Sequence, residues 1–198
     1  MQKLIRSLIL GAALALPSLS AAQFSQSYNF LKAIKDRDIT ETNKYVGKPG
    51  SVIIDTHDQT NGETALHIVT KERDLSWLGF LLSKGAKPDT RDRQGETPLL
   101  IATRLNFIEG VEVLLSYNAG IDVTNSSGET ALIRAVQNNN ASLVKLLLTQ
   151  GANPDKADHI AGLSARDYAT RNTRNPAMLK VFEETHPAKA KPKQGPSL

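Results

Sequence analysis

The chain has 198 residues, 40% of them hydrophobic and 22% charged, a composition typical of one globular domain rather than a disordered or membrane-embedded chain. It contains no cysteine, which excludes disulfides, cysteine nucleophiles and thiolate metal sites. Its net charge is +4, and five of the 24 basic residues lie within ten residues of a chain end, namely Lys3, Arg6, Lys189, Lys191 and Lys193. The other 19 stand against 20 acidic residues, so the body has no basic excess to neutralise phosphates and we predict no nucleic-acid partner.

Residues 1–22 have the three-part organisation of a secretory signal peptide. Lys3 and Arg6 give a positive start, Leu8–Leu16 is an uncharged apolar run, and Ser20–Ala22 offers small residues for cleavage. The apolar run is short for a membrane span, which needs about 20 apolar residues, so an uncleaved anchor is the disfavoured alternative. We expect cleavage after Ala22 and a mature periplasmic protein that starts at Gln23 and has no integral membrane segment, full secretion being the alternative.

The next segment predicts two helices without a clear motif. Apolar stretches occur at Phe30–Ile34 and at Ile39–Val46, and a longer loop over 47–61 follows them.

From residue 62 onward the sequence repeats itself every 33 residues. One motif occurs as Gly62-Glu-Thr-Ala-Leu-His, Gly95-Glu-Thr-Pro-Leu-Leu and Gly128-Glu-Thr-Ala-Leu-Ile. A second motif keeps the same period, as Gly85-Ala-Lys-Pro-Asp, Asn118-Ala-Gly-Ile-Asp and Gly151-Ala-Asn-Pro-Asp.

In the C-terminal part the first motif occurs once more in altered form, and the residues after it no longer follow the repeat. Gly162-Leu-Ser-Ala repeats the first motif with Ser164 in the place of threonine, 34 residues after Gly128. Residues 176–184 predict a second helix for this unit. Residues 187–198 contain Pro, Lys and Gly and almost no sizeable apolar group, so we expect a disordered basic tail.

These motifs resemble the ankyrin repeat, a unit of about 33 residues built from a turn and two helices. The resemblance covers residues 27–186 and implies an all-α solenoid of stacked helix-turn-helix units joined by β-hairpin-like loops. We expect a signal peptide over 1–22, an ankyrin-repeat domain over 23–186 and the tail over 187–198. Within the domain, full repeats over 62–94, 95–127 and 128–161 lie between capping repeats over 27–61 and 162–186, because a repeat buries its face only against neighbours.

The repeated residues have identifiable structural roles. Thr64, Thr97 and Thr130 can cap the first helix of each unit, and Pro98 suits a first helical turn. Gly85, Asn118 and Gly151 can end the second helix in the left-handed conformation. The turn within each pair carries Arg73, Asn106 or Asn139 where the family usually has glycine; Arg73 is the costly one, and Asp74 can cap the helix after it. The core is expected to hold Trp77 and the leucines Leu66, Leu81, Leu82, Leu99, Leu114, Leu115, Leu132, Leu147 and Leu148.

No residue pattern predicts catalysis, a cofactor or a metal site. The four histidines have no ligand spacing, and neither a nucleophile elbow nor a phosphate-binding loop is present. In the ankyrin frame, His67 is expected to make hydrogen bonds between repeats. Glu63, Glu96 and Glu129 recur once per repeat and are expected to form a solvated row.

In such a solenoid the hairpins and first helices line a concave binding side. The positions predicted to contact a partner are Asp58, Asn61, Glu63, Lys71, Arg91, Arg93, Gln94, Glu96, Arg104, Leu105, Ser126, Ser127, Glu129, Gln137, Asn138 and His159. Three guanidinium groups, those of Arg91, Arg93 and Arg104, lie on the middle repeat, and arginine is favoured at interface anchors. We therefore predict a partner with an acidic patch, the alternative being a solvated face partly neutralised by Asp92 and Glu96.

The sequence thus predicts a monomeric, non-catalytic protein-binding module of the bacterial periplasm, with no cofactor. Two alternatives use the same surface. An immunity-type inhibitor of an envelope-targeted toxin would have one tight partner. A secreted effector would bind a host protein and would be recovered from the medium.

Overall fold

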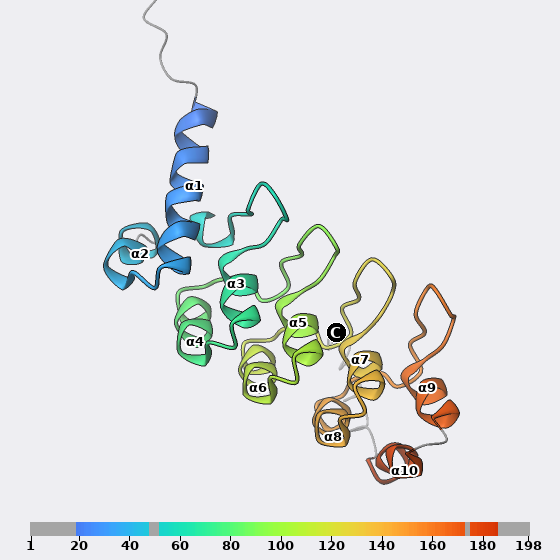
Figure 1. Cartoon of the computed structure of the whole chain (residues 1–198). Helices are drawn as coiled ribbons and strands as arrows, with labels where there is room; N and C mark the ends of the chain where they lie inside the picture. Colours follow the sequence, from blue (N-terminus) through green and yellow to red (C-terminus); the bar gives the residue numbers. More distant parts are fainter. Residues whose placement is uncertain (1–18, 48–51, 173–174, 186–198) are drawn as a thin grey trace, which may run out of the picture.

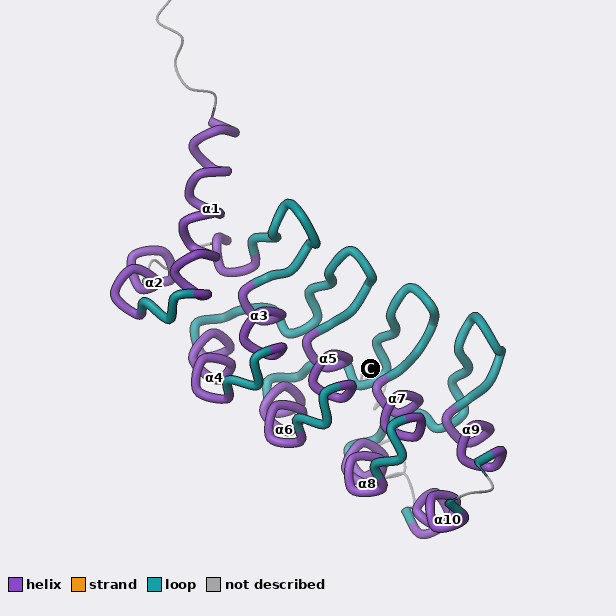
Figure 2. The backbone as a smooth tube through the Cα atoms, in the orientation of Figure 1, coloured by secondary structure: helices purple, strands orange, loops and turns teal. Residues whose placement is uncertain are grey.

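The computed structural model describes residues 19–47, 52–172 and 175–185. Over these residues the chain forms ten α-helices and one short 3₁₀ turn, with no strand (Figure 2). The helices are α1 (Leu19–Lys35), α2 (Ile39–Val46), α3 (Ala65–Lys71), α4 (Leu75–Ser83), α5 (Pro98–Arg104), α6 (Ile108–Ser116), α7 (Ala131–Gln137), α8 (Ala141–Thr149), α9 (Ala165–Arg171) and α10 (Pro176–Glu184). The 3₁₀ turn, η1, is Val52–Asp55.

The helices form two rows along the molecule (Figure 1). One row contains α3, α5, α7 and α9, each packed against the next, and the other contains α4, α6, α8 and α10. The loops that precede α3, α5, α7 and α9 are hairpins that all project to the same side (Figures 1 and 2). The predicted all-α solenoid of helix pairs joined by hairpins is therefore confirmed.

Side-chain caps explain where the helices begin. The Thr97 hydroxyl accepts a hydrogen bond from the Leu100 N–H at 3.3 Å, and the Thr130 hydroxyl accepts one from the Ile133 N–H at 3.2 Å. The Asp74 carboxylate accepts the Trp77 N–H at 3.1 Å and so starts α4, as predicted. Each cap satisfies one of the backbone donors that a helix leaves free at its first turn.

Residues with positive φ explain where the helices end. Asn106, Asn118 and Asn139 adopt the left-handed conformation, with φ of 52°, 61° and 56°. Arg73 adopts it as well, with φ of 55°, and its guanidinium carbon lies 5.6 Å from the centre of the Phe107 ring. This cation–π contact offsets part of the cost of placing a non-glycine residue there.

The core lies between and beneath the two helix rows. Leu66, Leu99 and Leu132 are at most 2% exposed, so the first helices bury the face that contacts their neighbours. Of the six leucines predicted for the second helices, Leu115 alone is half-buried and the other five are buried. Trp77 also lies at the edge of the core: its ring packs edge-on against Phe80 and faces the Arg37 guanidinium at 5.5 Å.

The capping units have the predicted helix pairs. α1 packs against α2, α3 and η1, and α10 packs against α8 and α9. The first helix starts at Leu19, earlier than expected, so it includes the predicted cleavage position after Ala22. Residues 1–18 of the predicted signal peptide and the predicted tail over 187–198 lie outside the described residues. Among the helices of the described ranges, none combines the length and the apolarity that a membrane span requires.

Candidate functional site

The four hairpins share one turn geometry. In each, a backbone N–H donates across the hairpin to a carbonyl five or fewer residues later, at 2.8–3.2 Å; the four donors are Asp58, Asp92, Asn125 and Asp158. The side chains of the last three also close the turn. The Asp92 carboxylate, for example, accepts the N–H groups of Gln94 and Glu96, both at 2.9 Å. These buried side chains therefore stabilise the turns, because they accept hydrogen bonds from backbone N–H groups that would otherwise lack a partner.

Neighbouring hairpins are joined by a ladder of single backbone hydrogen bonds. The N–H of Arg93 donates to the Asn61 carbonyl at 3.0 Å, that of Ser126 to Gln94 at 3.2 Å, and that of His159 to Ser127 at 2.9 Å. A second series uses side chains: Asp55, Asp89 and Asp122 each accept a backbone N–H from the next unit, that of Lys87, Gly120 and Asn153 respectively, at 2.8–2.9 Å. The hairpins thus form one continuous layer.

His67 connects two repeats as predicted. Its side chain is fully buried, and its Nδ1 accepts the Thr64 N–H at 3.1 Å. Because an N–H group can only donate, the ring proton lies on Nε2, which donates to the Glu96 carbonyl at 2.9 Å. The imidazole is therefore a neutral bridge from α3 to the second hairpin.

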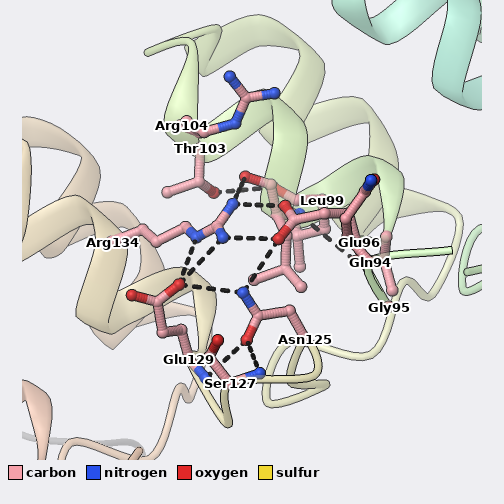
Figure 3. Close-up of polar contacts among 12 residues, drawn as sticks. Gln94, Gly95, Glu96, Leu99, Thr103, Arg104, Asn125, Ser127, Glu129 and Arg134 are labelled. Atoms are coloured by element: carbon pink, nitrogen blue, oxygen red, sulfur yellow. Dashed lines mark hydrogen bonds and ion pairs between the residues drawn. The ribbon is translucent and has the colours of Figure 1, made fainter. Parts of the chain in front are cut away.

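The middle of the molecule contains an ion network that the sequence did not predict (Figure 3). Arg134 on α7 binds both carboxylate oxygens of Glu96, with Nη2 2.6 Å from Oε1, and also binds Glu129 at 3.0 Å. The Asn125 amide donates to both carboxylates at 3.0 Å and so completes the network. The side chains of Arg134 and Glu96 are 11% and 12% exposed, so this bidentate pair is largely shielded from solvent.

The network shifts the pKa values of Glu129 and Arg134. Burial alone would raise the pKa of Glu129, but hydrogen bonds from Arg134 and Asn125 and the charge of Arg134 outweigh it, and the pKa is lowered. Burial alone would lower the pKa of Arg134, but the same contacts with Glu96 and Glu129 leave it raised. Glu129 and Arg134 are therefore both charged at neutral pH.

The prediction that Glu63, Glu96 and Glu129 form a solvated row is wrong. Their side chains are 10%, 12% and 25% exposed, and each makes an intramolecular ion pair, Glu63 with Lys71 and the other two with Arg134. The signal in the sequence was Arg134 itself, which stands where the preceding repeats have Ile68 and Ile101. A charged residue in an apolar column requires a nearby counter-charge, and the recurring glutamates supply it.

The other predicted contact residues lie on one surface, which we call the hairpin face: the four hairpins together with the exposed side of α3, α5, α7 and α9 (Figure 1). Its exposed members are Lys71, Arg91, Arg93, Gln94, Arg104, Ser126, Gln137, Asn138 and His159, and its half-buried members are Asp58, Asn61, Leu105 and Ser127. Leu105 packs partly against the core, so it offers less apolar surface than its sequence position suggested.

The three arginines of the middle repeat are not equivalent. Arg91 donates to the carbonyls of Gly95 and Thr124, and Arg93 donates to the Gln59 carbonyl, so both connect neighbouring hairpins. Arg104 has no ion pair within the described part of the chain and points away from the network (Figure 3). Arg171, at the same position of the last repeat, is also exposed; it belongs to this surface and was missed.

The described residues contain no group of three or more His, Asp or Glu side chains that could hold a metal ion. The polar groups with shifted pKa values are paired with partners that the fold itself supplies. The hairpin face presents exposed charged side chains, which suit non-covalent recognition.

Comparison with known proteins agrees with the fold. A search of curated proteins found no match to the chain. A family model for ankyrin repeats (3 copies) matches residues 19–126 and 114–182, which is most of the chain and all four hairpins. The chain therefore belongs to the ankyrin-repeat family, whose repeats generally serve as protein–protein interaction modules.

Proposed function

We propose that this chain is an exported protein-binding module of the bacterial periplasm, and that its hairpin face binds an acidic surface of its partner. The supporting observation is how the charges of this face are distributed. Several of its carboxylates are turned inward: Glu63, Asp92 and Asp158 are 8%, 8% and 5% exposed, and Glu96 is paired with Arg134. Its cations are turned outward, because Arg91, Arg93, Arg104 and Arg171 are all exposed.

This separation makes the face basic although the body of the chain is nearly neutral. Among the described residues, the exposed carboxylates of these hairpins and helices are those of Glu72, Asp89, Asp155 and Asp167. Glu72 pairs with Arg37 and Asp155 with Arg166, while Asp89 and Asp167 accept the N–H groups of Gly120 and Ser164. A partner therefore meets exposed guanidinium groups beside carboxylates that already have partners within the chain. Arginine forms bidentate hydrogen bonds with carboxylates, so an acidic protein surface is the complementary partner.

The proposed compartment rests on the N-terminal sequence alone. Lys3 and Arg6, the apolar run and the small residues before Gln23 favour export and cleavage. Expression of the full chain in a bacterium, osmotic-shock fractionation and N-terminal sequencing test this directly. We expect a periplasmic product that starts at Gln23; an uncleaved cytoplasmic product would contradict export, and recovery from the medium would favour the secreted-effector alternative.

Affinity capture from the same fraction tests the binding face. Arg104→Glu combined with Arg171→Glu reverses two exposed charges, and neither side chain makes an ion pair within the described residues. We expect this variant to weaken capture of the partner by about tenfold or more, and wild-type binding to weaken with added salt. Arg91 and Arg93 are left unchanged, because their hydrogen bonds join hairpins and their loss would disturb the fold.

The matched control reverses two charges on the opposite helix row, through Lys145→Glu on α8 and Lys180→Glu on α10. Both lysines are exposed. The control therefore changes the net charge by the same amount as the arginine variant, but on the opposite side of the molecule. A partner that is lost with the arginine variant and kept with the lysine variant supports the hairpin face. Equal losses in both variants, or no loss in either, would sink the assignment of this face.

A further inference from the structure

The backbone ladder of the hairpins ends at an acceptor without a donor. In the first three hairpins, the carbonyl just before the turn glycine, that of Asn61, Gln94 or Ser127, accepts an N–H from the following hairpin. The corresponding carbonyl in the last hairpin is that of Ala161, which precedes Gly162. Among the described residues, no backbone N–H donates to it. One hydrogen bond of the ladder is therefore open at the C-terminal edge.

The outer side of the last hairpin is also uncovered. A Cβ built on Gly62, Gly95 or Gly128 would lie 2.8, 2.9 or 2.7 Å from a backbone nitrogen of the following hairpin. A Cβ built on Gly162 would have no atom within 4 Å. Ile160, in the same turn, is 81% exposed, the largest value among the large hydrophobic residues of the described chain. This edge thus combines a free acceptor with an exposed apolar side chain.

The side-chain series between the units has an open end at the same place. Asp55, Asp89 and Asp122 each accept a backbone N–H from the following unit. The next member of this series is Asp155, which among the described residues accepts a side-chain hydrogen bond from Arg166 and no N–H from a following unit. Its side chain is 68% exposed, whereas that of Asp55 is 18% exposed. The last unit therefore has two open acceptors, one from each series.

The donors of both series lie at fixed distances along the chain. In the second, third and fourth hairpins, the donor to the aspartate comes three residues after the C-cap of the preceding helix, and the donor to the hairpin carbonyl comes nine residues after it. Each C-cap with its two donors is Lys84 with Lys87 and Arg93, Tyr117 with Gly120 and Ser126, and Gln150 with Asn153 and His159. The fold thus fixes how much chain separates a second helix from these two hydrogen bonds.

The same count after α10 reaches two residues that can donate. The C-cap of α10 is Thr185, so the third residue after it is Ala188 and the ninth is Gln194. Both belong to the predicted tail over 187–198, outside the described residues. Proline has no N–H, and the three prolines of this tail occupy neither position: Pro187, Pro192 and Pro196. The chain that follows α10 therefore has a donor for each open acceptor.

A second copy of the chain does not fit this edge. Its equivalent donor is the Gln59 N–H of the first hairpin, for which the described residues contain no acceptor. Stacked hairpins accompany packed first helices, so a bond from Gln59 to Ala161 would bring α3 of one copy against α9 of the other. That side of α3 already packs against α1 (Figure 1). A segment that directly continues the chain from α10 meets no such obstacle.

We propose that residues 186–198 dock in an extended conformation on the outer side of the last hairpin and so close the solenoid. The Ala188 N–H donates to the Asp155 carboxylate, and the Gln194 N–H donates to the Ala161 carbonyl. The composition of this segment alone predicts disorder, but composition takes no account of two acceptors at the matching distance. The docked segment covers a backbone edge that is otherwise open to pairing with other chains.

The side chains of the segment alternate in the way that docking on one face requires. Lys189, Lys191 and Lys193 are separated by single uncharged residues. In an extended conformation successive side chains point to opposite faces, so the three lysines share one face and the uncharged residues share the other. The uncharged face covers Ile160, and the lysines point to solvent.

The test uses a spin label on the full-length protein. The chain has no cysteine, so Ser197→Cys provides a single attachment site for a nitroxide. The unpaired electron broadens the signals of nearby amides in ¹⁵N-labelled protein, and we expect this broadening at residues 158–163 and not at residues 57–62 of the first hairpin. Without the label, the amides of Ala188 and Gln194 should exchange with water about fivefold more slowly than that of Ala190, because each makes a hydrogen bond.

Proline substitutions distinguish the bonded position from its neighbours. Gln194→Pro removes the donor and should abolish the broadening at residues 158–163. Ala190→Pro is the matched control, because it adds the same ring to the same segment at a residue that donates to neither acceptor, and it should preserve the broadening. Ile160→Asp should weaken the broadening, whereas Val52→Asp, at a residue that is 79% exposed, should preserve it.

Three results would overturn the proposal. The first is the absence of broadening at the last hairpin, and the second is an equal effect of Gln194→Pro and Ala190→Pro. The third is broadening in ¹⁵N-labelled protein that lacks the nitroxide when it is mixed with unlabelled protein that carries it, because the segment then docks on another copy. None of these measurements involves the partner of the hairpin face, so this proposal and the proposed function stand or fail independently.

Discussion

Arg134 is the residue whose role differs most from the role that its place in the repeat predicts. It lies in a column that Ile68 and Ile101 fill with apolar side chains, both at most 5% exposed. A guanidinium in such a place is tolerated because Glu96 and Glu129 neutralise it and the Leu100 carbonyl lies within 3.5 Å. The network joins the second hairpin to α7 and so connects two repeats through charge rather than through apolar packing alone.

Removal of the arginine should therefore be costly. Arg134→Ile restores the apolar column but leaves two carboxylates without their cation, and we expect it to destabilise the protein by about 3 kcal/mol. The combination with Glu96→Gln and Glu129→Gln removes the uncompensated charges and should recover most of this loss. Urea unfolding measures both variants. Equal stability of Arg134→Ile and the wild type would contradict a structural role for the network.

His67 gives the fold a pH dependence of known sign. Burial lowers the pKa of His67, although the Glu96 carbonyl and the charges of Asp92 and Glu96 partly oppose it. The folded state therefore binds the proton less readily than the unfolded state, in which the pKa is about 6.5. Stability is full above that value and is lost as the pH falls from about 6.5 to the lowered pKa of the folded state.

The substitution His67→Gln isolates this contribution. Glutamine does not titrate, so the variant should lack the stability change that the wild type shows between about pH 7.5 and about pH 5.5. It should also be less stable near neutral pH by about 1–3 kcal/mol, because the bridge between Thr64 and Glu96 is weakened. Urea unfolding at several pH values measures both effects, with the exposed His159→Ala as control. Parallel pH profiles for His67→Gln and the wild type would contradict this assignment.

At the scale of the element, the hairpin is the unit that repeats most regularly. Each turn glycine has φ between 64° and 79°, a conformation that costs L-residues about 1–2 kcal/mol. In the first three hairpins the next hairpin also packs against that glycine at close range. The glycine thus serves both the turn and the stacking, and these two roles can be separated experimentally.

Gly128→Ala and Gly162→Ala form the matched pair for this purpose. Both place alanine at positive φ, but a Cβ at Gly128 would lie 2.7 Å from the His159 backbone nitrogen, whereas one at Gly162 meets open space. We expect a loss of about 1 kcal/mol for Gly162→Ala from backbone strain alone. Overpacking should bring the loss for Gly128→Ala to about 2–4 kcal/mol, measured by thermal unfolding. Equal losses would show that the neighbouring hairpin shifts to accommodate the alanine side chain with no further loss of stability.

At the scale of the whole molecule, each repeat contacts mainly its two neighbours. The first helices pack in series, α3 to α5 to α7 to α9, so stability is a sum of repeats and interfaces. The last unit has one neighbour in this series, and α10 holds it through fully buried Met178 and through Phe182, which is 5% exposed. Opening of this end should therefore precede opening of the middle.

Met178→Ala tests this one-dimensional behaviour. We expect a loss of about 2–4 kcal/mol in the free energy that opens α9 and α10, because a buried side chain is truncated. Native-state hydrogen exchange should show faster exchange in these two helices and nearly unchanged exchange in α3 and α4. The exposed Lys180→Ala on the same helix is the control and should change little. Faster exchange throughout the chain would mean that the solenoid opens as a single unit.

The sequence by itself determined the fold and most element boundaries. The 33-residue period, the threonine caps and the left-handed Asn106, Asn118 and Asn139 all act within a few residues of chain, so they can be recognised without knowing the long-range contacts. The role of His67 followed instead from the resemblance to the ankyrin repeat, since the other two motifs have Leu100 and Ile133 at this position. The position of the hairpin face followed from the same register.

Only the tertiary structure decided which side chains of that face turn inward. Glu96 and Arg134 are 38 residues apart, and the Ala161 carbonyl is open because no further hairpin covers it. Sequence register places a residue on a surface, but burial and pairing depend on the side chains that neighbouring repeats bring within a few ångström. For that reason the glutamates expected to form a solvated row are paired within the chain, Glu96 and Glu129 with Arg134 and Glu63 with Lys71. The basic character of the hairpin face likewise emerged only from these pairings.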